Sequence, residues 1–243
     1  MALSPYLKST PLHGWLTRLR RLSKEQNQSD VRFLRLLKHR EIDLLIDAGA
    51  NSGQYAAWLR SLGFMSPIVS FEPVSSAYAA LEATAARHGS WICRRQALGD
   101  APGTAVINVS GENGAVSSSI LPLTARHRAL DPRSAATHTE TIDVVRLDTV
   151  FPAIVGLSRH PFLKIDVQGY EKWVLEGARG CLDRIDLIQL ELSLSPVYEN
   201  EMLLPEGITF LEGLGFELVG LIPEYADATG RLWQTNALFW RAS

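Results

Sequence analysis

Short apolar runs alternate with segments of helical spacing along the first half of the chain. Apolar runs over residues 42–47, 67–72 and 91–97 are typical of strands. Between them, residues 52–62 and 75–88 have helical spacing, and each segment is followed by a helix-ending glycine, Gly63 and Gly89. This alternation predicts an α/β fold, in which a parallel sheet is flanked by helices.

The middle of the chain departs from this rhythm. Residues 104–109 and 141–147 are rich in β-formers, whereas the polar segment 110–140 between them is predicted to be a long loop that acts as a lid or binding loop. Alternation then resumes. We expect strands at 161–166, 186–192, 216–222 and 232–240, the last two as a hairpin, and helices at 170–182 and 203–214.

The N-terminal segment differs from the rest in pattern and charge. Residues 11–22 and 30–39 predict two short helices, and residues 1–40 carry nine Lys and Arg against two acidic residues. We therefore predict a helical arm over 1–40 and one globular domain over 41–243. The basic arm either contacts an anionic substrate or the surface of a membrane, or is simply a solvated helix face.

Composition is that of an ordinary globular protein, with 46% hydrophobic residues and a net charge of −2. No apolar run is long enough to span a bilayer and no signal-type segment opens the chain, so a cytoplasmic location is expected. The two cysteines give no disulfide framework or zinc pattern. Without aromatic and basic residues interleaved on a sheet, nucleic-acid binding is not expected. The oligomeric state is left open.

Acidic or loop-forming residues recur where each predicted strand ends. They are Asp47 with the loop Gly49–Asn51, then Glu72, Leu98–Asp100, Asp166–Gln168 and Glu191. In an open α/β sheet, ligands bind at this edge. Glu72 follows the glycine loop at the distance expected for a carboxylate that binds ribose hydroxyls. The loop lacks the full dinucleotide fingerprint, because Asn51 replaces its second glycine, and this favours a cofactor without phosphate, such as S-adenosylmethionine.

Four segments resemble the FkbM-type methyltransferases, which are S-adenosylmethionine-dependent O-methyltransferases. They are Asp47–Tyr55 (DAGANSGQY), Phe71–Pro73, Gln96–Asp100 and, most diagnostic, Phe162–Glu171 (FLKIDVQGYE). The resemblance implies a class I Rossmann-like fold with a mostly parallel seven-stranded sheet, an antiparallel final strand and helices on both faces. It also implies methyl transfer to a hydroxyl of a sugar, a glycolipid or a glycosylated natural product, a preference that rests on family analogy.

The resemblance also implies a role for each matching position. The methionine part of the cofactor would be lined by Asp47, Gly49, Asn51 and Gln54. Glu72 would hold the ribose, and the adenine would be flanked by Leu98 and Asp100. Either Ser118 or Ser119 would close over the cofactor, and Asp166 would lie beside the sulfonium.

The acceptor hydroxyl needs a group that removes its proton. Asp166 and Glu191 end adjacent predicted strands, where they either share a Mg²⁺ ion or provide a metal-free base. The family often has Glu where this chain has Gln168, and the neutral amide weakens a metal role. Lys164 and Glu171, beside the same strand end, are either functional or form structural ion pairs.

His127 is a further candidate base in the loop. Arg126, Arg128 and Arg133 surround it in the sequence. Their charges are expected to lower its pKa and keep it neutral. The alternative is a solvated loop histidine.

Two other functions remain open at this point. A nucleotide-dependent oxidoreductase is disfavoured by the missing third glycine and by the lack of a second nucleotide-binding half. A non-catalytic binding protein on a methyltransferase fold is disfavoured by the intact acidic strand ends.

Overall fold

The computed structural model describes residues 30–111 and 117–242 and divides the chain between Glu41 and Ile42. In the first unit, residues 30–39 form the helix expected there. The helix predicted at 11–22, with most of the basic arm, lies outside the described residues. Within the described part, no helix has the length and apolarity needed to cross a membrane.

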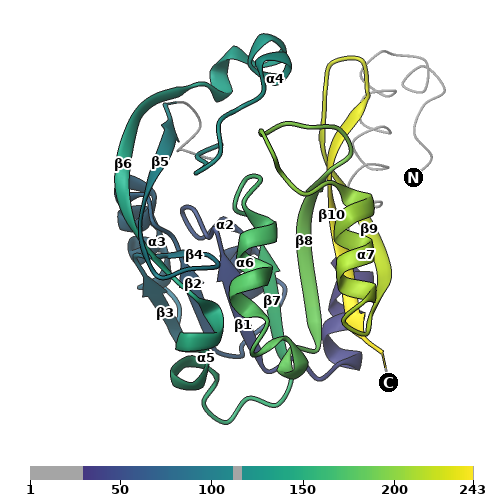
Figure 1. Ribbon diagram of the computed structural model, residues 1–243. Helices are drawn as coiled ribbons and strands as arrows, with labels where there is room; N and C mark the ends of the chain where they lie inside the picture. The colour runs from purple at the N-terminus through teal and green to yellow at the C-terminus, as the bar shows by residue number, and fades with distance from the viewer. Residues whose placement is uncertain (1–29, 112–116, 243) are drawn as a thin grey trace, which may run out of the picture. The chain divides into compact units, whose positions relative to one another are not determined.

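A seven-stranded sheet forms the centre of the unit that begins at Ile42 (Figure 1). Its strands are β1 (Leu44–Ala48), β2 (Ile68–Phe71), β3 (Trp91–Arg94), β7 (Pro161–Ile165), β8 (Leu187–Ser193), β9 (Phe216–Ala226) and β10 (Leu232–Arg241). The order is β3-β2-β1-β7-β8-β10-β9, in which β10 is antiparallel to both of its neighbours. Every residue of β1, β2, β7 and β8 is buried. This explains why these strands are apolar runs and not alternating patterns.

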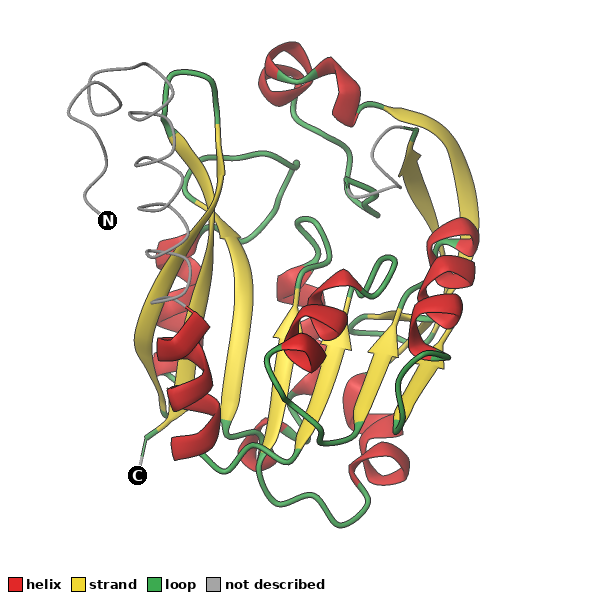
Figure 2. Ribbon diagram, turned by 180° about the vertical axis from the view of Figure 1, so that it is seen from behind, coloured by secondary structure: helices red, strands yellow, loops and turns green. Residues whose placement is uncertain are grey.

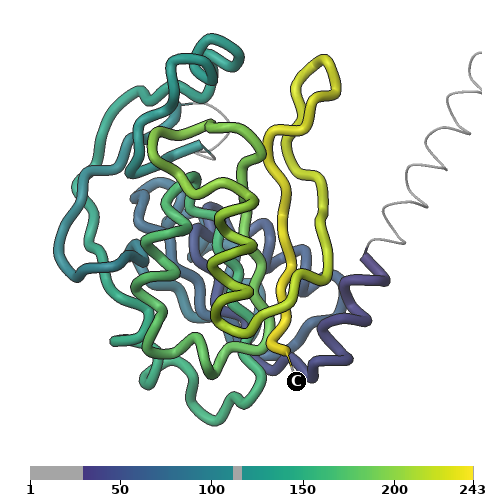
Figure 3. The backbone as a smooth tube through the Cα atoms, turned by 45° about the vertical axis from the view of Figure 1, so that its right-hand side comes forward, coloured from purple at the N-terminus to yellow at the C-terminus, as the bar shows by residue number. Residues whose placement is uncertain are grey.

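Helices cover both faces of this sheet. They are α2 (Gln54–Ser61), α3 (Ser75–Ala85), α5 (Leu147–Val155), α6 (Glu171–Ala178) and α7 (Leu204–Glu212). Helices α6 and α7 lie on the face shown in Figure 1, and α2 lies on the face shown in Figure 2. The β9–β10 hairpin forms one edge of the sheet, where its two strands run side by side in Figure 3. The sequence predicted this sheet and most of these helices, but not α5.

A second, three-stranded sheet corrects two expectations for the middle of the chain. It has the order β4-β6-β5, with β4 at Ala97–Leu98, β5 at Gly103–Ser110 and β6 at Ala136–Val145. The strand expected at 91–97 is therefore broken, because β4 leaves the large sheet and pairs with β6. The expected loop 110–140 contains α4 (Ala125–Leu130), a 3₁₀ turn (Pro132–Ser134) and the first half of β6.

Candidate functional site

A pocket of about 670 Å³, open mouth included, lies at the carboxyl ends of β1, β2 and β7, beside β4. Seven of the residues expected to bind a cofactor line it: Gly49, Asn51, Gln54, Glu72, Leu98, Ser118 and Asp166. Apolar side chains complete the wall, among them Phe71, Val74, Ile107 and Ile120. Residues that the sequence places at separate strand ends thus meet at one cavity.

The glycine loop has its shape because two backbone segments approach closely. Gly49 has φ +75°, and a Cβ there would lie 1.8 Å from the carbonyl oxygen of Asp166. Glycine is therefore required to let the ends of β1 and β7 meet. Asn51 adopts the left-handed conformation, at φ 47°, which asparagine tolerates better than most other non-glycine residues.

Glu72 is buried at the edge of the pocket, with 5% of its surface exposed. One carboxylate oxygen accepts a hydrogen bond from the backbone N–H of Asn51 at 2.8 Å and the other from that of Val74 at 2.9 Å. Burial raises the pKa of Glu72 to about 7, against the opposing effect of these two hydrogen bonds. The carboxylate is held in place and each oxygen can accept a further bond from a ligand.

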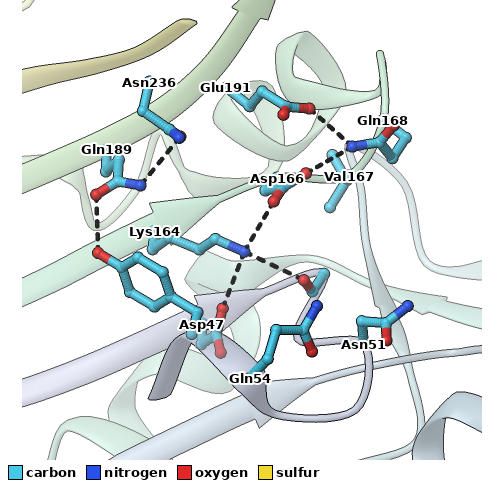
Figure 4. A network of polar contacts seen from close by, with 12 residues as sticks. Asp47, Asn51, Gln54, Lys164, Asp166, Val167, Gln168, Gln189, Glu191 and Asn236 are labelled. Carbon is cyan, nitrogen blue, oxygen red and sulfur yellow. Dashed lines mark hydrogen bonds and ion pairs between the residues drawn. The ribbon is translucent and has the colours of Figure 1, made fainter. Parts of the chain in front are cut away.

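Lys164 is a buried cation at the centre of the strand ends (Figure 4). Its Nζ lies 3.3 Å from Asp47, 3.2 Å from Asp166 and 3.2 Å from the carbonyl oxygen of Gly49. Burial lowers the pKa of Lys164, but the carboxylates of Asp166 and Asp47 outweigh burial and raise it overall. Lys164 therefore stays charged, which supports the ion-pair interpretation. Asp47, fully buried, holds Lys164 and does not line the pocket.

Gln168 connects Asp166 and Glu191, the two acidic residues for which a shared metal ion was one of two alternatives. Its Nε2 donates to Asp166 at 2.8 Å and to Glu191 at 2.7 Å (Figure 4). Its Oε1 accepts from the hydroxyl of Tyr198 at 2.8 Å. Gln168 is held in the left-handed region, at φ 57°. No sequence pattern indicated Tyr198, because its contact with Gln168 depends on the path of the loop after β8.

Glu191 lies within β8, is buried and does not line the pocket. Burial raises its pKa well above the usual range, and the neighbouring charge of Asp166 adds to the effect. The carboxyl group of Glu191 therefore favours its protonated form. By accepting a hydrogen bond from the Gln168 amide, it helps to hold the Gln168 side chain in place. Glu171, also buried, accepts from the backbone N–H groups of Val167 and Gly169, both at 3.1 Å, and so fixes the turn after β7.

The donor set around Asp166 and Glu191 does not fit a magnesium ion. An amide N–H already occupies one oxygen of each carboxylate, and the Lys164 ammonium occupies the other oxygen of Asp166. Mg²⁺ needs oxygen ligands and repels an adjacent ammonium group. Among the described residues, no group of three or more His, Cys, Asp or Glu side chains could hold a metal. The Mg²⁺ alternative thus finds no support in the described residues.

His127 and Asp100 are not brought to the pocket, and the two candidate serines differ in position. His127 lies on α4, where its ring packs against Tyr225 and Trp233 at centroid distances of 5.7 and 5.9 Å. Burial lowers its pKa, while Asp131 opposes this, so the expected direction holds but the loop arginines are not its cause. The side chain of Asp100 is exposed beyond β4. Ser118 lines the pocket, whereas Ser119 donates to the backbone carbonyl of Gln168 at 2.5 Å.

Comparison with known proteins adds a family and a fold. Residues 47–218 match the model of the methyltransferase FkbM domain. Magnesium protoporphyrin IX methyltransferase from Synechocystis PCC 6803, solved with bound S-adenosylmethionine, is similar with a TM-score of 0.50 and 10% identity over 100% of this chain and 86% of that one. A Burkholderia thailandensis 1,6-didemethyltoxoflavin-N1-methyltransferase is similar with a TM-score of 0.42 and 14% identity over 100% and 92% of the two chains. No curated protein sequence matches the chain.

Proposed function

Because the chain belongs to the methyltransferase FkbM family, we propose that it transfers a methyl group to a hydroxyl oxygen of a sugar, a glycolipid or a glycosylated natural product. Family and fold make it an S-adenosylmethionine-dependent methyltransferase, which contradicts the oxidoreductase alternative. The observation that carries the proposal is the pocket itself, where Glu72 and Asp166 both face the same cavity. The saccharide class is supported by the family resemblance.

The residues present fit this cofactor. Glu72 has lone pairs for two ribose hydroxyls, and the apolar walls at Phe71, Leu98 and Ile107 suit a purine ring. Asn51 and Gln54 lie on the glycine-loop side, beside Asp166, and suit the amino acid part. When bound, the cofactor supplies an activated methyl group, so the protein has only to position the acceptor and remove its proton.

Asp166 is the carboxylate placed to receive that proton. Its side chain is 31% exposed and lines the pocket, whereas Glu191 and Asp47 do not. Lys164 holds one of its oxygens and Gln168 the other, which fixes the carboxylate in one orientation. Each oxygen keeps a lone pair that can accept the hydroxyl proton of an acceptor. Glu191 acts through Gln168 and is a positioning residue.

A methyl-transfer assay with labelled S-adenosylmethionine tests the proposal. Hydroxylated saccharides and glycolipids serve as acceptors, and Asp166→Asn is compared with Asp100→Asn, which removes a carboxylate outside the pocket. We expect Asp166→Asn to lower kcat about 10²- to 10⁴-fold and Asp100→Asn to leave it close to wild type. Binding of S-adenosylhomocysteine, followed by calorimetry, should persist in both variants.

The stability of the product in mild alkali distinguishes a methyl group on a hydroxyl oxygen from one on a carboxylate. An ether on a hydroxyl oxygen resists mild alkali, whereas a methyl ester does not. Label that alkali releases would contradict hydroxyl methylation, and cofactor binding without transfer to any acceptor would favour a non-catalytic binding protein.

A further inference from the structure

A second cavity, of about 690 Å³ with its open mouth, lies beside the cofactor pocket. Its walls come from β5, from the segment that follows residue 117, from α4 and the turn after it, and from the loop after β8. The lining residues that matter here are Asn108, Ser119, Arg128, Ser134 and Tyr198. The methyltransferase site described above does not use this cavity.

The two cavities share a wall. Asn108 and Ser119 pair as a β-bridge, through backbone hydrogen bonds of 2.8 and 3.0 Å. Alternate residues of this ribbon face opposite sides, as in any strand. Ile107, Ser118 and Ile120 line the cofactor pocket, whereas Asn108, Ser119 and Leu121 line the second cavity. The second cavity thus lies directly across this wall from the cofactor.

Gln168 contacts the walls of both cavities. This residue lines the cofactor pocket and donates to Asp166. From the second cavity, the Ser119 hydroxyl reaches the Gln168 backbone carbonyl and the Tyr198 hydroxyl reaches its side chain. A molecule in the second cavity therefore lies next to the network that orients the proton acceptor.

Arg128 gives this cavity a positive charge. It is the one charged residue in the lining that the structure describes. Its Nη2 donates to the carbonyl oxygen of Leu123 at 3.2 Å, and no carboxylate of the described chain pairs with it. The remaining N–H groups of the guanidinium can bind an oxyanion, with two parallel bonds where the geometry allows.

Asn108 and Ser134 offer further hydrogen-bonding groups. The Asn108 amide nitrogen donates one of its two N–H groups to the carbonyl oxygen of Ser119 at 3.1 Å, so its second N–H remains to donate and its carbonyl oxygen remains to accept. The Ser134 hydroxyl donates to the carbonyl oxygen of Asp131 at 2.6 Å, which leaves its lone pairs. A matching ligand carries hydroxyl groups as donors and one anionic group, while Leu121, Pro122 and Ala135 offer an apolar surface to its C–H face.

We infer that this cavity binds an acidic sugar unit of the methyl acceptor, with the anionic group on Arg128 and hydroxyls on Asn108 and Ser134. The inference rests on the proposed function and narrows its substrate class to anionic saccharides, whose charge is a carboxylate or a phosphate.

Ligand-observed NMR titrations test the inference. The probes are a hexuronic acid, a hexose phosphate, the neutral hexose and inorganic phosphate, and the proteins are wild type, Arg128→Gln, Arg128→Lys and Arg126→Gln. Arg126 is the matched control, since it lies on the same helix and stacks on Trp233 outside the cavity. Each variant is also titrated with S-adenosylhomocysteine.

At least one acidic sugar should bind about tenfold more tightly than the neutral hexose, and its identity distinguishes carboxylate from phosphate. Arg128→Gln should remove the preference, while Arg128→Lys and Arg126→Gln keep most of it. S-adenosylhomocysteine should bind every variant alike, which also shows that each is folded. Equal binding of acidic and neutral sugars would overturn the inference. The inference would also be overturned if inorganic phosphate bound as tightly as the hexose phosphate. The same holds if Arg126→Gln lost the preference for acidic sugars to the same extent as Arg128→Gln. If the wild-type protein does not bind S-adenosylhomocysteine, the proposed function is rejected, whether or not any sugar binds.

Discussion

The pKa of Glu72 makes cofactor binding depend on pH near neutrality. Burial raises this pKa to about 7. Ribose hydroxyls donate hydrogen bonds, and the ionised carboxylate is the stronger acceptor for them. Because Glu72 gains a proton as the pH falls through its pKa, affinity for S-adenosylhomocysteine should be full above this range and decrease below it.

The expected size of the effect follows from that value. With a pKa of about 7, Glu72 is about 90% ionised at pH 8 and about 10% at pH 6. If only the ionised form binds the ribose, the dissociation constant rises about tenfold between these two conditions, which is about 1.4 kcal/mol. Glu171, with a pKa of about 8, titrates in the same range but does not line the pocket.

Calorimetric titration of S-adenosylhomocysteine at several pH values between 6 and 8 measures this change. Glu72→Gln should bind about tenfold or more weakly at pH 8 and should lose the pH dependence. The matched control, Glu82→Gln, removes an exposed carboxylate of α3 and should keep the wild-type profile. Equal wild-type affinity at both extremes, or an unchanged slope in Glu72→Gln, would refute the assignment of this carboxylate to the ribose.

Two further predictions concern stability. Gly49→Ala should destabilise the fold by about 3 kcal/mol or more in urea unfolding, because its Cβ meets the Asp166 carbonyl. Gly63 also has a positive φ, but a Cβ added there would have nothing within 4 Å, so Gly63→Ala should lower the free energy of unfolding by only about 1 kcal/mol. Equal losses in the two variants would contradict the close approach of Gly49 to Asp166. Glu72 and Glu171, whose pKa values are raised, contribute a stability that increases as the pH falls. His127 acts in the opposite direction: its pKa is lowered, so its own contribution to stability should be full above about pH 6.5 and decrease as the pH falls. His127→Phe should flatten this dependence in thermal unfolding, and a wild-type profile in that variant would count against the burial argument.

The sequence predicted the large sheet well because its strands are buried on both faces. Runs such as residues 68–71 and 161–165 have few polar side chains to interrupt the signal. The middle of the chain was harder, because β4 is two residues long and obtains its partner from β6, far along the chain. Local periodicity carries no information about such long-range pairing, so the break before Ala97 and the second sheet were missed.

The same limit applied to the site. The strand-end rule located the pocket, and Asn51 and Glu72, which were expected there, line it. The roles of Gln168 and Tyr198 depend on side chains from two separate loops that meet in space. His127 was placed in a mobile loop by composition, but the aromatic rings of the β9–β10 hairpin bury it.

Asp47 and Asp166 show why a strand-end residue is not always a ligand-binding residue. Both follow apolar runs, and by sequence they look equivalent. Asp47, however, lies inside β1, where the parallel register places it directly beside Lys164 of β7. Asp166 follows the last residue of β7, so its side chain reaches the pocket while Lys164 contacts it from below. A shift of one or two positions relative to the strand end therefore separates a buried counter-ion from a carboxylate that faces the pocket, and only the register between the strands decides which is which.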